Sequence, residues 1–115
     1  MATVKSVLAP KGLLARYQKA SEVVNFPPFT IYGVEREKGK FGEQLVFLCE
    51  QNNYWFKLSL SPNKAREALY EYFLVKDAEP LTNVVLRRYG RVYSFVDATI
   101  EDAQMVLPIE ETEGV

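Results

Sequence analysis

The sequence predicts a single, mainly β domain of five strands, with one amphipathic helix between the third strand and the fourth. Three observations lead to this fold class. The chain has 115 residues, which is long enough to bury one hydrophobic core. Short segments rich in β-branched and aromatic residues follow one another, and Gly, Pro or Asn separates them. A single stretch after Pro62 instead repeats apolar residues at helical spacing.

The chain divides into three parts by composition. Residues 1–24 form a basic N-terminal extension with four basic residues and one acidic residue. Residues 25–97 carry the predicted strands and helix, and residues 98–115 form an acidic C-terminal tail with five acidic residues. The net charge of −1 therefore hides a basic start and an acidic end, a pattern typical of partner-binding or solvated tails. In the extension, a short helix and a strand fit the pattern equally well at Leu8, Leu13, Leu14 and Tyr17.

The first predicted strand follows a pair of adjacent prolines. Because these prolines exclude a helix and favour an extended backbone, we expect the strand over residues 29–36. Gly33 inside this strand predicts a bulge or a bend. If the odd-numbered side chains face the core, Tyr32 and Arg36 lie on the outer face.

A polar loop joins the first strand to the second. It contains two glycines and carries Lys38, Lys40 and Phe41. The second strand, over residues 43–51, contains the continuous apolar run Leu45–Cys49, which predicts burial on both faces of the strand, or on one face with a partner covering the other. We expect the cysteine in this run to be a buried core residue.

A tight hairpin leads into the third strand. Asn52 and Asn53 tolerate positive φ angles, which the short turns of hairpins require. The third strand, over residues 54–60, places its even-numbered apolar side chains in the core. Trp55 and Lys57 then share the outer face, where a flat ring lies close to a cation.

The predicted helix begins with Ser61 as its N-cap and Pro62 at its first helical position. Its apolar face is predicted to contain Ala65, Ala68, Leu69, Tyr72 and Phe73. Its solvated face is predicted to contain Lys64, Arg66, Glu67 and Glu71.

Two further strands, over residues 83–89 and 92–97, complete the pattern. In the first of them, Val84 and Leu86 are the better core candidates. The densest basic cluster of the chain lies at this hairpin and has an aromatic ring within it: Arg87, Arg88, Tyr89 and Arg91.

The composition argues against several classes of protein. The chain has no histidine and only one cysteine, so it offers neither a Cys–His pair nor a thiolate zinc site. Neither phosphate-binding glycine motif occurs, and we expect neither an enzyme nor a bound cofactor. No apolar run is long enough to span a membrane, and no signal-peptide pattern is present. We therefore expect a cytoplasmic protein that does not contact a membrane.

The order strand, strand, strand, helix, strand, strand resembles that of the oligonucleotide-binding (OB) fold, a small five-stranded barrel. The stretch GKFGEQLVFLCEQNNYWFKLSLSPNKAREALYEYF is similar to the lysine- and glycine-containing loop, long hairpin and helix of small phage-type single-stranded DNA-binding proteins. The resemblance covers residues 29–97. It implies an OB-like barrel in a viral protein of DNA replication or recombination. The chain ends in Glu113-Gly114-Val115, without the Asp-Phe-type tip through which related bacterial proteins recruit partners.

The resemblance also implies where nucleic acid would bind. In OB barrels, the outer face of two neighbouring strands and the adjoining loops contact the ligand. We expect single-stranded DNA rather than RNA, bound with little sequence preference. The cations expected to contact phosphates are Arg36, Lys38, Lys40, Lys57, Arg87 and Arg91. The rings expected to stack on bases are Tyr32, Phe41, Trp55 and Tyr89.

Each of these residues also has a purely structural interpretation. Trp55 can pack beneath another segment, and the arginines can form salt bridges. The alternative function is a protein-interaction module, namely an adaptor, inhibitor or structural subunit with Trp55 at its interface. In either case we expect a homodimer or a larger homo-oligomer, because Leu45–Cys49 supplies apolar surface on both faces of its strand.

Overall fold

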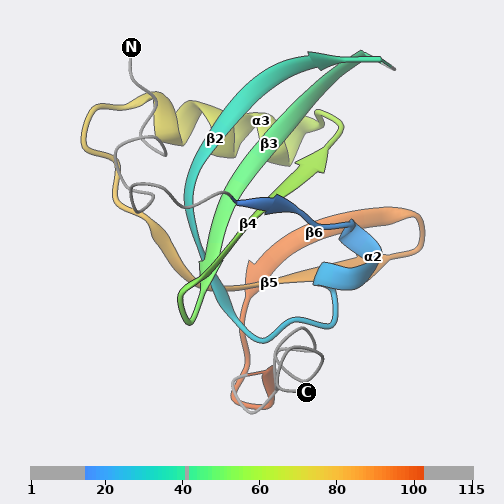
Figure 1. Ribbon diagram of the computed structural model, residues 1–115, viewed down its shortest axis with the longest axis vertical. Coiled ribbons are helices and arrows are strands. Elements are labelled where there is room, and N and C mark those ends of the chain that lie inside the picture. The colour runs from blue at the N-terminus through green and yellow to red at the C-terminus, as the bar shows by residue number, and fades with distance from the viewer. Residues whose placement is uncertain (1–14, 41, 103–115) are drawn as a thin grey trace.

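The structure is a computed structural model that describes residues 15–40 and 42–102. Its strands are β1 (Arg16–Tyr17), β2 (Phe29–Gly39), β3 (Gly42–Gln51), β4 (Tyr54–Leu60), β5 (Leu81–Tyr89) and β6 (Val92–Asp97). Its helices are α2 (Ala20–Val23) and α3 (Lys64–Leu74). The strands form one mixed sheet in the order β1-β4-β3-β2-β5-β6 (Figure 1). The mainly β fold class is therefore confirmed. No helix within the described residues has the length and apolar character needed to span a membrane.

The predicted count of five strands is wrong, because the N-terminal extension adds a sixth. β1 runs parallel to β4, with Arg16 opposite Phe56 and Tyr17 opposite Lys57. A strand of two residues has no alternating pattern, so the sequence could not reveal it. β1 and β6 form the two edges of the sheet. Strand pairing among the described residues therefore does not close the sheet into a barrel.

β2 and β3 form a long, curved hairpin through the middle of the molecule (Figure 1). The register of this pair shifts between Ile31 and Gly33, which confirms the predicted bulge. Beyond the shift, Arg36 lies opposite Leu45, whose side chain belongs to the core. The prediction that Arg36 lies on the outer face is therefore wrong. One extra residue in a strand inverts the alternation of every side chain that follows it.

The hydrophobic core is rich in phenylalanine. The ring of Phe56 meets Phe26 edge to face at 5.2 Å between centroids, and it meets Phe29 in the same way at 5.5 Å. Val84 and Leu86 point into this core, as predicted. Among the core side chains is also the fully buried cysteine of the apolar run in β3. Burial raises the pKa of this Cys49 thiol, which keeps the thiol protonated.

The turn between β3 and β4 is the predicted one. Asn52 and Asn53 have φ angles of 51° and 73°, as a two-residue hairpin turn with positive φ requires. The carboxylate of Glu50 accepts a hydrogen bond from the Asn53 backbone N–H at 2.6 Å. The side chains at the end of β3 therefore support the turn that aligns β4.

α3 begins two residues later than predicted. Asn63, not Ser61, is the N-cap, and its side-chain oxygen accepts a hydrogen bond from the Arg66 backbone N–H at 2.8 Å. The predicted apolar face is also partly wrong, because Ala65, Ala68 and Tyr72 are exposed. The side chains that α3 buries or half-buries toward the sheet are Arg66, Leu69, Tyr70 and Phe73. The contacts of Arg66 explain this rotation of the helix.

Arg66 is only 7% exposed, although the sequence placed it on the solvated face. Its Nη1 atom donates a hydrogen bond to the Ser61 carbonyl, and its Nη2 atom donates to the Tyr93 carbonyl, both at 2.6 Å. Ser61 directly follows β4, and Tyr93 lies in β6. The guanidinium therefore connects two strands that do not pair with each other, and it draws this face of α3 toward the sheet.

We expect Asn63→Ala to lower the free energy of unfolding by about 1 kcal/mol, because the first turn of α3 loses its capping acceptor. Ser61→Ala is the matched control, since Ser61 is exposed and precedes the cap; its effect should stay within about 0.5 kcal/mol. Urea unfolding followed by circular dichroism measures both variants. A larger effect at Ser61 than at Asn63 would contradict the observed start of the helix.

We expect Arg66→Ala to lower the free energy of unfolding by about 2–4 kcal/mol, because two hydrogen bonds from a charged donor are lost together with buried packing. Lys64→Ala removes an exposed cation from the same helix and serves as the control. Equilibrium unfolding in urea measures the difference. Equal losses of unfolding free energy in the two variants would show that the two hydrogen bonds of Arg66 do not stabilise the fold.

Candidate nucleic-acid interface

Trp55 lies on the outer face of the sheet, as predicted, but it is not open to a ligand. It is 8% exposed, and its ring lies 4.8 Å from the ring of Tyr32, with an angle of 40° between the planes. The expectation of an accessible stacking platform at Trp55 is therefore wrong. Tyr32 comes from the bulged part of β2, so the two rings pack across the sheet on the face opposite the core. Together they act as a structural pair.

Lys57 is paired with an aromatic ring that the sequence analysis did not assign to the site. Its Nζ atom lies 5.5 Å from the centre of the Tyr17 ring, because β1 places Tyr17 beside Lys57. The Tyr17 side chain is 57% exposed. Partial burial, and then the nearby Glu37 carboxylate, raise the pKa of Tyr17. Only the parallel pairing of β1 brings these groups together, and a parallel pairing of two residues leaves no sequence pattern.

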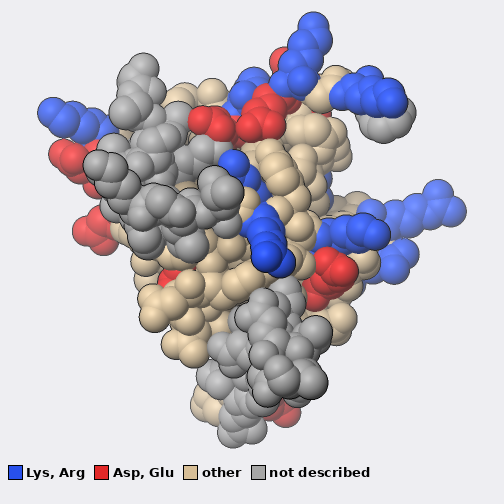
Figure 2. All heavy atoms as spheres, viewed as in Figure 1, with Lys and Arg blue, Asp and Glu red and all other residues tan. Residues whose placement is uncertain are grey.

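The outer face around Lys57 is not strongly basic. Along β2, the register places Glu35 and Glu37 on the same face as Lys57, and Glu50 of β3 lies on this face as well. Figure 2 shows acidic groups close to the cations on this side of the molecule. These carboxylates would repel a phosphate chain, so the sheet face alone is a poor surface for nucleic acid.

Arg36 is bound to acidic groups rather than free for phosphate. Its guanidinium forms ion pairs with Glu43 of β3, at 2.8 Å, and with Glu67 of α3. It also lies 4.6 Å from the centre of the Tyr70 ring. These contacts follow from the inverted register beyond the bulge. They fix the outer half of the β2–β3 hairpin to α3.

Arg87 forms a second structural ion pair. Its Nη2 atom lies 2.5 Å from a carboxylate oxygen of Asp102, which is 7% exposed. The same carboxylate accepts hydrogen bonds from the Thr99 backbone N–H, at 2.8 Å, and from the Thr99 hydroxyl, at 3.0 Å. The hydrogen bonds from the Thr99 backbone and hydroxyl, and then the positive charge of Arg87, lower the pKa of Asp102. This cluster fixes the segment after β6 to β5.

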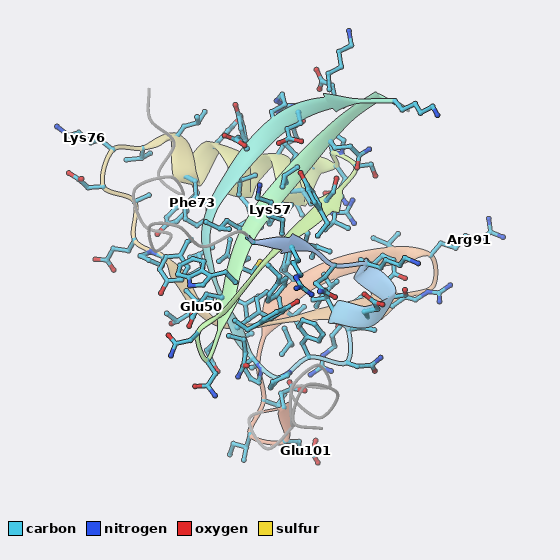
Figure 3. All side chains as sticks on the ribbon, in the orientation of Figure 1. Glu50, Lys57, Phe73, Lys76, Arg91 and Glu101 are labelled. Atoms are coloured by element: carbon cyan, nitrogen blue, oxygen red, sulfur yellow. The ribbon has the colours of Figure 1, made fainter. Side chains whose placement is uncertain are left out.

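The remaining predicted residues lie at two hairpin tips. Lys38 and Lys40 are exposed at the end of the β2–β3 hairpin, and Tyr89, which is 56% exposed, and Arg91 lie at the end of the β5–β6 hairpin. Both hairpins project toward the same side in Figure 1, and basic side chains gather at their ends in Figure 2. The labelled Arg91 points away from the domain (Figure 3). Phe41 lies outside the described residues.

The cations at these tips differ from Arg36 and Arg87 in their partners. Within residues 15–40 and 42–102, no carboxylate forms an ion pair with Lys38, Lys40 or Arg91. Arg88, at the second tip, is also exposed, and its Nε atom donates a hydrogen bond to the Gly90 carbonyl at 2.7 Å. The charges of the tips are therefore directed at solvent.

The described part of the chain contains no group of three or more Cys, Asp or Glu side chains that could hold a metal ion. Comparison with protein-family models found no matching family. Comparisons with curated proteins and with solved structures found no significant match.

We expect the Arg87–Asp102 cluster to make stability depend on pH. The pKa of Asp102 in the folded protein lies below its ordinary value of 3.8, so its carboxylate stabilises the fold above that pH. This stabilisation is lost as the pH falls through the lowered folded-state pKa. The midpoint of urea unfolding should therefore fall more in the unmodified protein than in Asp102→Asn between about pH 6 and pH 2.

The exposed neighbour Glu101 provides the control for this measurement, as Glu101→Gln. We expect that variant to follow the pH dependence of the unmodified protein. If the urea midpoint falls equally with pH in the unmodified protein and in Asp102→Asn, the ion pair does not contribute to the pH dependence of stability.

Proposed function

We propose that this protein binds single-stranded DNA, with little sequence preference, through the tips of its two projecting hairpins. The observation that carries this proposal is the placement of exposed basic side chains at both tips, on one side of the molecule (Figure 2). Non-specific single-strand binders combine cations along the path of the phosphates with rings that stack on bases. The tip of the β2–β3 hairpin offers the cations Lys38 and Lys40. The tip of the β5–β6 hairpin offers the cation Arg91 and the ring of Tyr89.

The connectivity supports an OB-like barrel as the scaffold of this proposal. β2 pairs with β3 on one side and with β5 on the other, and α3 lies between β4 and β5 in the chain. OB folds are partly open five-stranded barrels whose ligands lie against one face and two loops. In this chain, those two loops correspond to the tips of the β2–β3 and β5–β6 hairpins. The Arg66 bridge takes the place of strand pairing between β4 and β6.

The other predicted site residues then act by positioning the β2–β3 and β5–β6 hairpins. Arg36 holds the β2–β3 hairpin against α3, and Arg87 holds the segment that follows β6. Trp55 and Tyr32 stiffen the sheet between the two hairpins. Lys57, with the exposed Tyr17 ring beside it, is the sheet residue best placed to contact a strand that crosses between the tips.

The run Leu45–Cys49 is buried within one chain, so the expectation that it supplies a surface for a second copy is wrong. A homodimer still fits this proposal, because one domain offers few phosphate contacts. Each phosphate contact of a single strand contributes a slope of about 0.7 to the dependence of log affinity on log salt. Two copies that bind the same strand would double the number of contacts and raise the apparent affinity through effective concentration.

A protein-interaction module is the second candidate, and a different surface favours it. At the end of α3, Leu74 and Val75 are 56% and 62% exposed, and the neighbouring Tyr72 is 38% exposed. Contiguous exposed apolar side chains often mark a site for a protein partner. This surface lies at the opposite end of α3 from the capped first turn.

The proposal predicts that charge at the two tips controls affinity for DNA. The double variants Lys38→Ala/Lys40→Ala and Arg88→Ala/Arg91→Ala should each weaken binding to fluorescent oligo-dT. Each should also reduce the slope of log affinity against log salt by about 1.4, which corresponds to two phosphate contacts. Fluorescence anisotropy at several salt concentrations measures both effects.

The matched control is Lys64→Ala/Lys76→Ala, which also removes two exposed cations. Lys76 and Arg91 lie on opposite sides of the view in Figure 3. We expect this control to bind oligo-dT as the unmodified protein does. Equal losses in all three double variants would indicate general charge attraction, and no binding at low salt would favour the protein-interaction module.

A further inference from the structure

A pocket of about 570 Å³ lies between α3 and the last two strands. Much of its wall is apolar, with Leu69 from α3, Leu81 and Val84 from β5, and Phe95 from β6. The residues with polar side chains that also line it are Asn63, Arg66, Thr82, Tyr93, Ser94 and Asp97. Small-molecule sites commonly have volumes of about 300–1,000 Å³ and combine apolar walls with a few polar groups. The pocket therefore has the size and the lining of a ligand site.

Arg66 gives this pocket a buried positive charge. A guanidinium carries five N–H donors. In Arg66, Nη1 and Nη2 each donate one hydrogen bond, to the Ser61 and Tyr93 carbonyls respectively. The Nε atom is buried and has no acceptor among the described residues. No described carboxylate forms an ion pair with Arg66. Two neutral carbonyls hold the group in place, but they do not supply a negative charge.

A buried charge without a counter-charge is costly, because the surrounding protein solvates it less well than water does. Desolvation lowers the pKa of Arg66, which reflects this cost. An anion in the pocket would interact with the guanidinium at a lower effective dielectric constant than at the surface. Arg66 therefore favours a ligand with a negative group, and the apolar walls favour a ligand with a hydrophobic body.

We propose that this pocket binds a small organic acid with one negative charge, with its carboxylate toward Arg66 and its apolar body against Leu69 and Phe95. Asp97 is an exposed carboxylate in the lining, and it repels a ligand with two negative charges more strongly than a ligand with one. The site shares no residue with the hairpin tips. Binding of an organic acid and binding of DNA are therefore independent properties, and each can fail without the other.

Phenylacetate is a suitable probe, because it joins one carboxylate to an apolar ring. Phenylacetamide is its neutral counterpart of the same shape, and phenylphosphonate carries a second negative charge. We expect phenylacetate to cause saturable shifts of the Arg66, Tyr93 and Ser94 amide signals in a two-dimensional NMR titration. Phenylacetamide should bind at least about tenfold more weakly, since it lacks the charge-assisted contact. Phenylphosphonate should also bind more weakly than phenylacetate.

Ala65→Phe tests the location of the site without removing the Arg66 bridge. Ala65 is exposed and lines the pocket, so a larger side chain there fills the pocket from the surface of α3. We expect this variant to stay folded and to bind phenylacetate at least about tenfold more weakly. Absence of saturable shifts, equal affinity for the acid and the amide, or unchanged binding by Ala65→Phe would each overturn the proposal.

Discussion

The hydrogen bonds of Arg66 join two parts of a sheet that strand pairing leaves apart. β4 and β6 do not pair, and the guanidinium connects the residue after β4 with a carbonyl in β6. β5 meets β2 at only two register positions, Phe29–Val84 and Ile31–Leu81. The orientation of the β5–β6 hairpin therefore depends on Arg66 as well as on the sheet. The same residue sets the face that α3 turns to the core, and it shapes the pocket beneath the helix.

The cations of this domain fall into groups with different physical roles. Arg36 and Arg87 lie in ion pairs that hold a hairpin to α3 and the segment after β6 to β5. Arg66 is buried without a described counter-charge, whereas Lys38, Lys40 and Arg91 project into solvent at the hairpin tips. A count of basic residues therefore does not describe a binding surface. The ion-paired arginines position the tips, and the exposed cations are the groups that a polyanion could reach.

The outer face of the sheet explains why the proposed DNA contacts lie on the hairpin tips. Trp55 is covered and packs against Tyr32, so it offers little surface for a base. Glu35, Glu37 and Glu50 add negative charge around Lys57. A flexible phosphate chain would meet less repulsion at the tip of the β5–β6 hairpin, where Arg88 and Arg91 are exposed, than on the centre of the sheet. At the other tip, Glu43 lies opposite Lys38 and pairs with Arg36, so the net positive charge there is smaller.

Local patterns predicted the five long strands, the Asn52–Asn53 turn and most of the core, because alternation and turn chemistry are local properties of the chain. They also identified the exposed cations of both tips. The remaining features could not be predicted from local patterns. β1 forms through a distant parallel partner, and the bulge at Gly33 turns Arg36 toward α3. The carbonyl of Tyr93, far along the chain, accepts a hydrogen bond from Arg66, and a ring on another strand packs on Trp55. Each of these outcomes depends on contacts between segments that no local pattern connects.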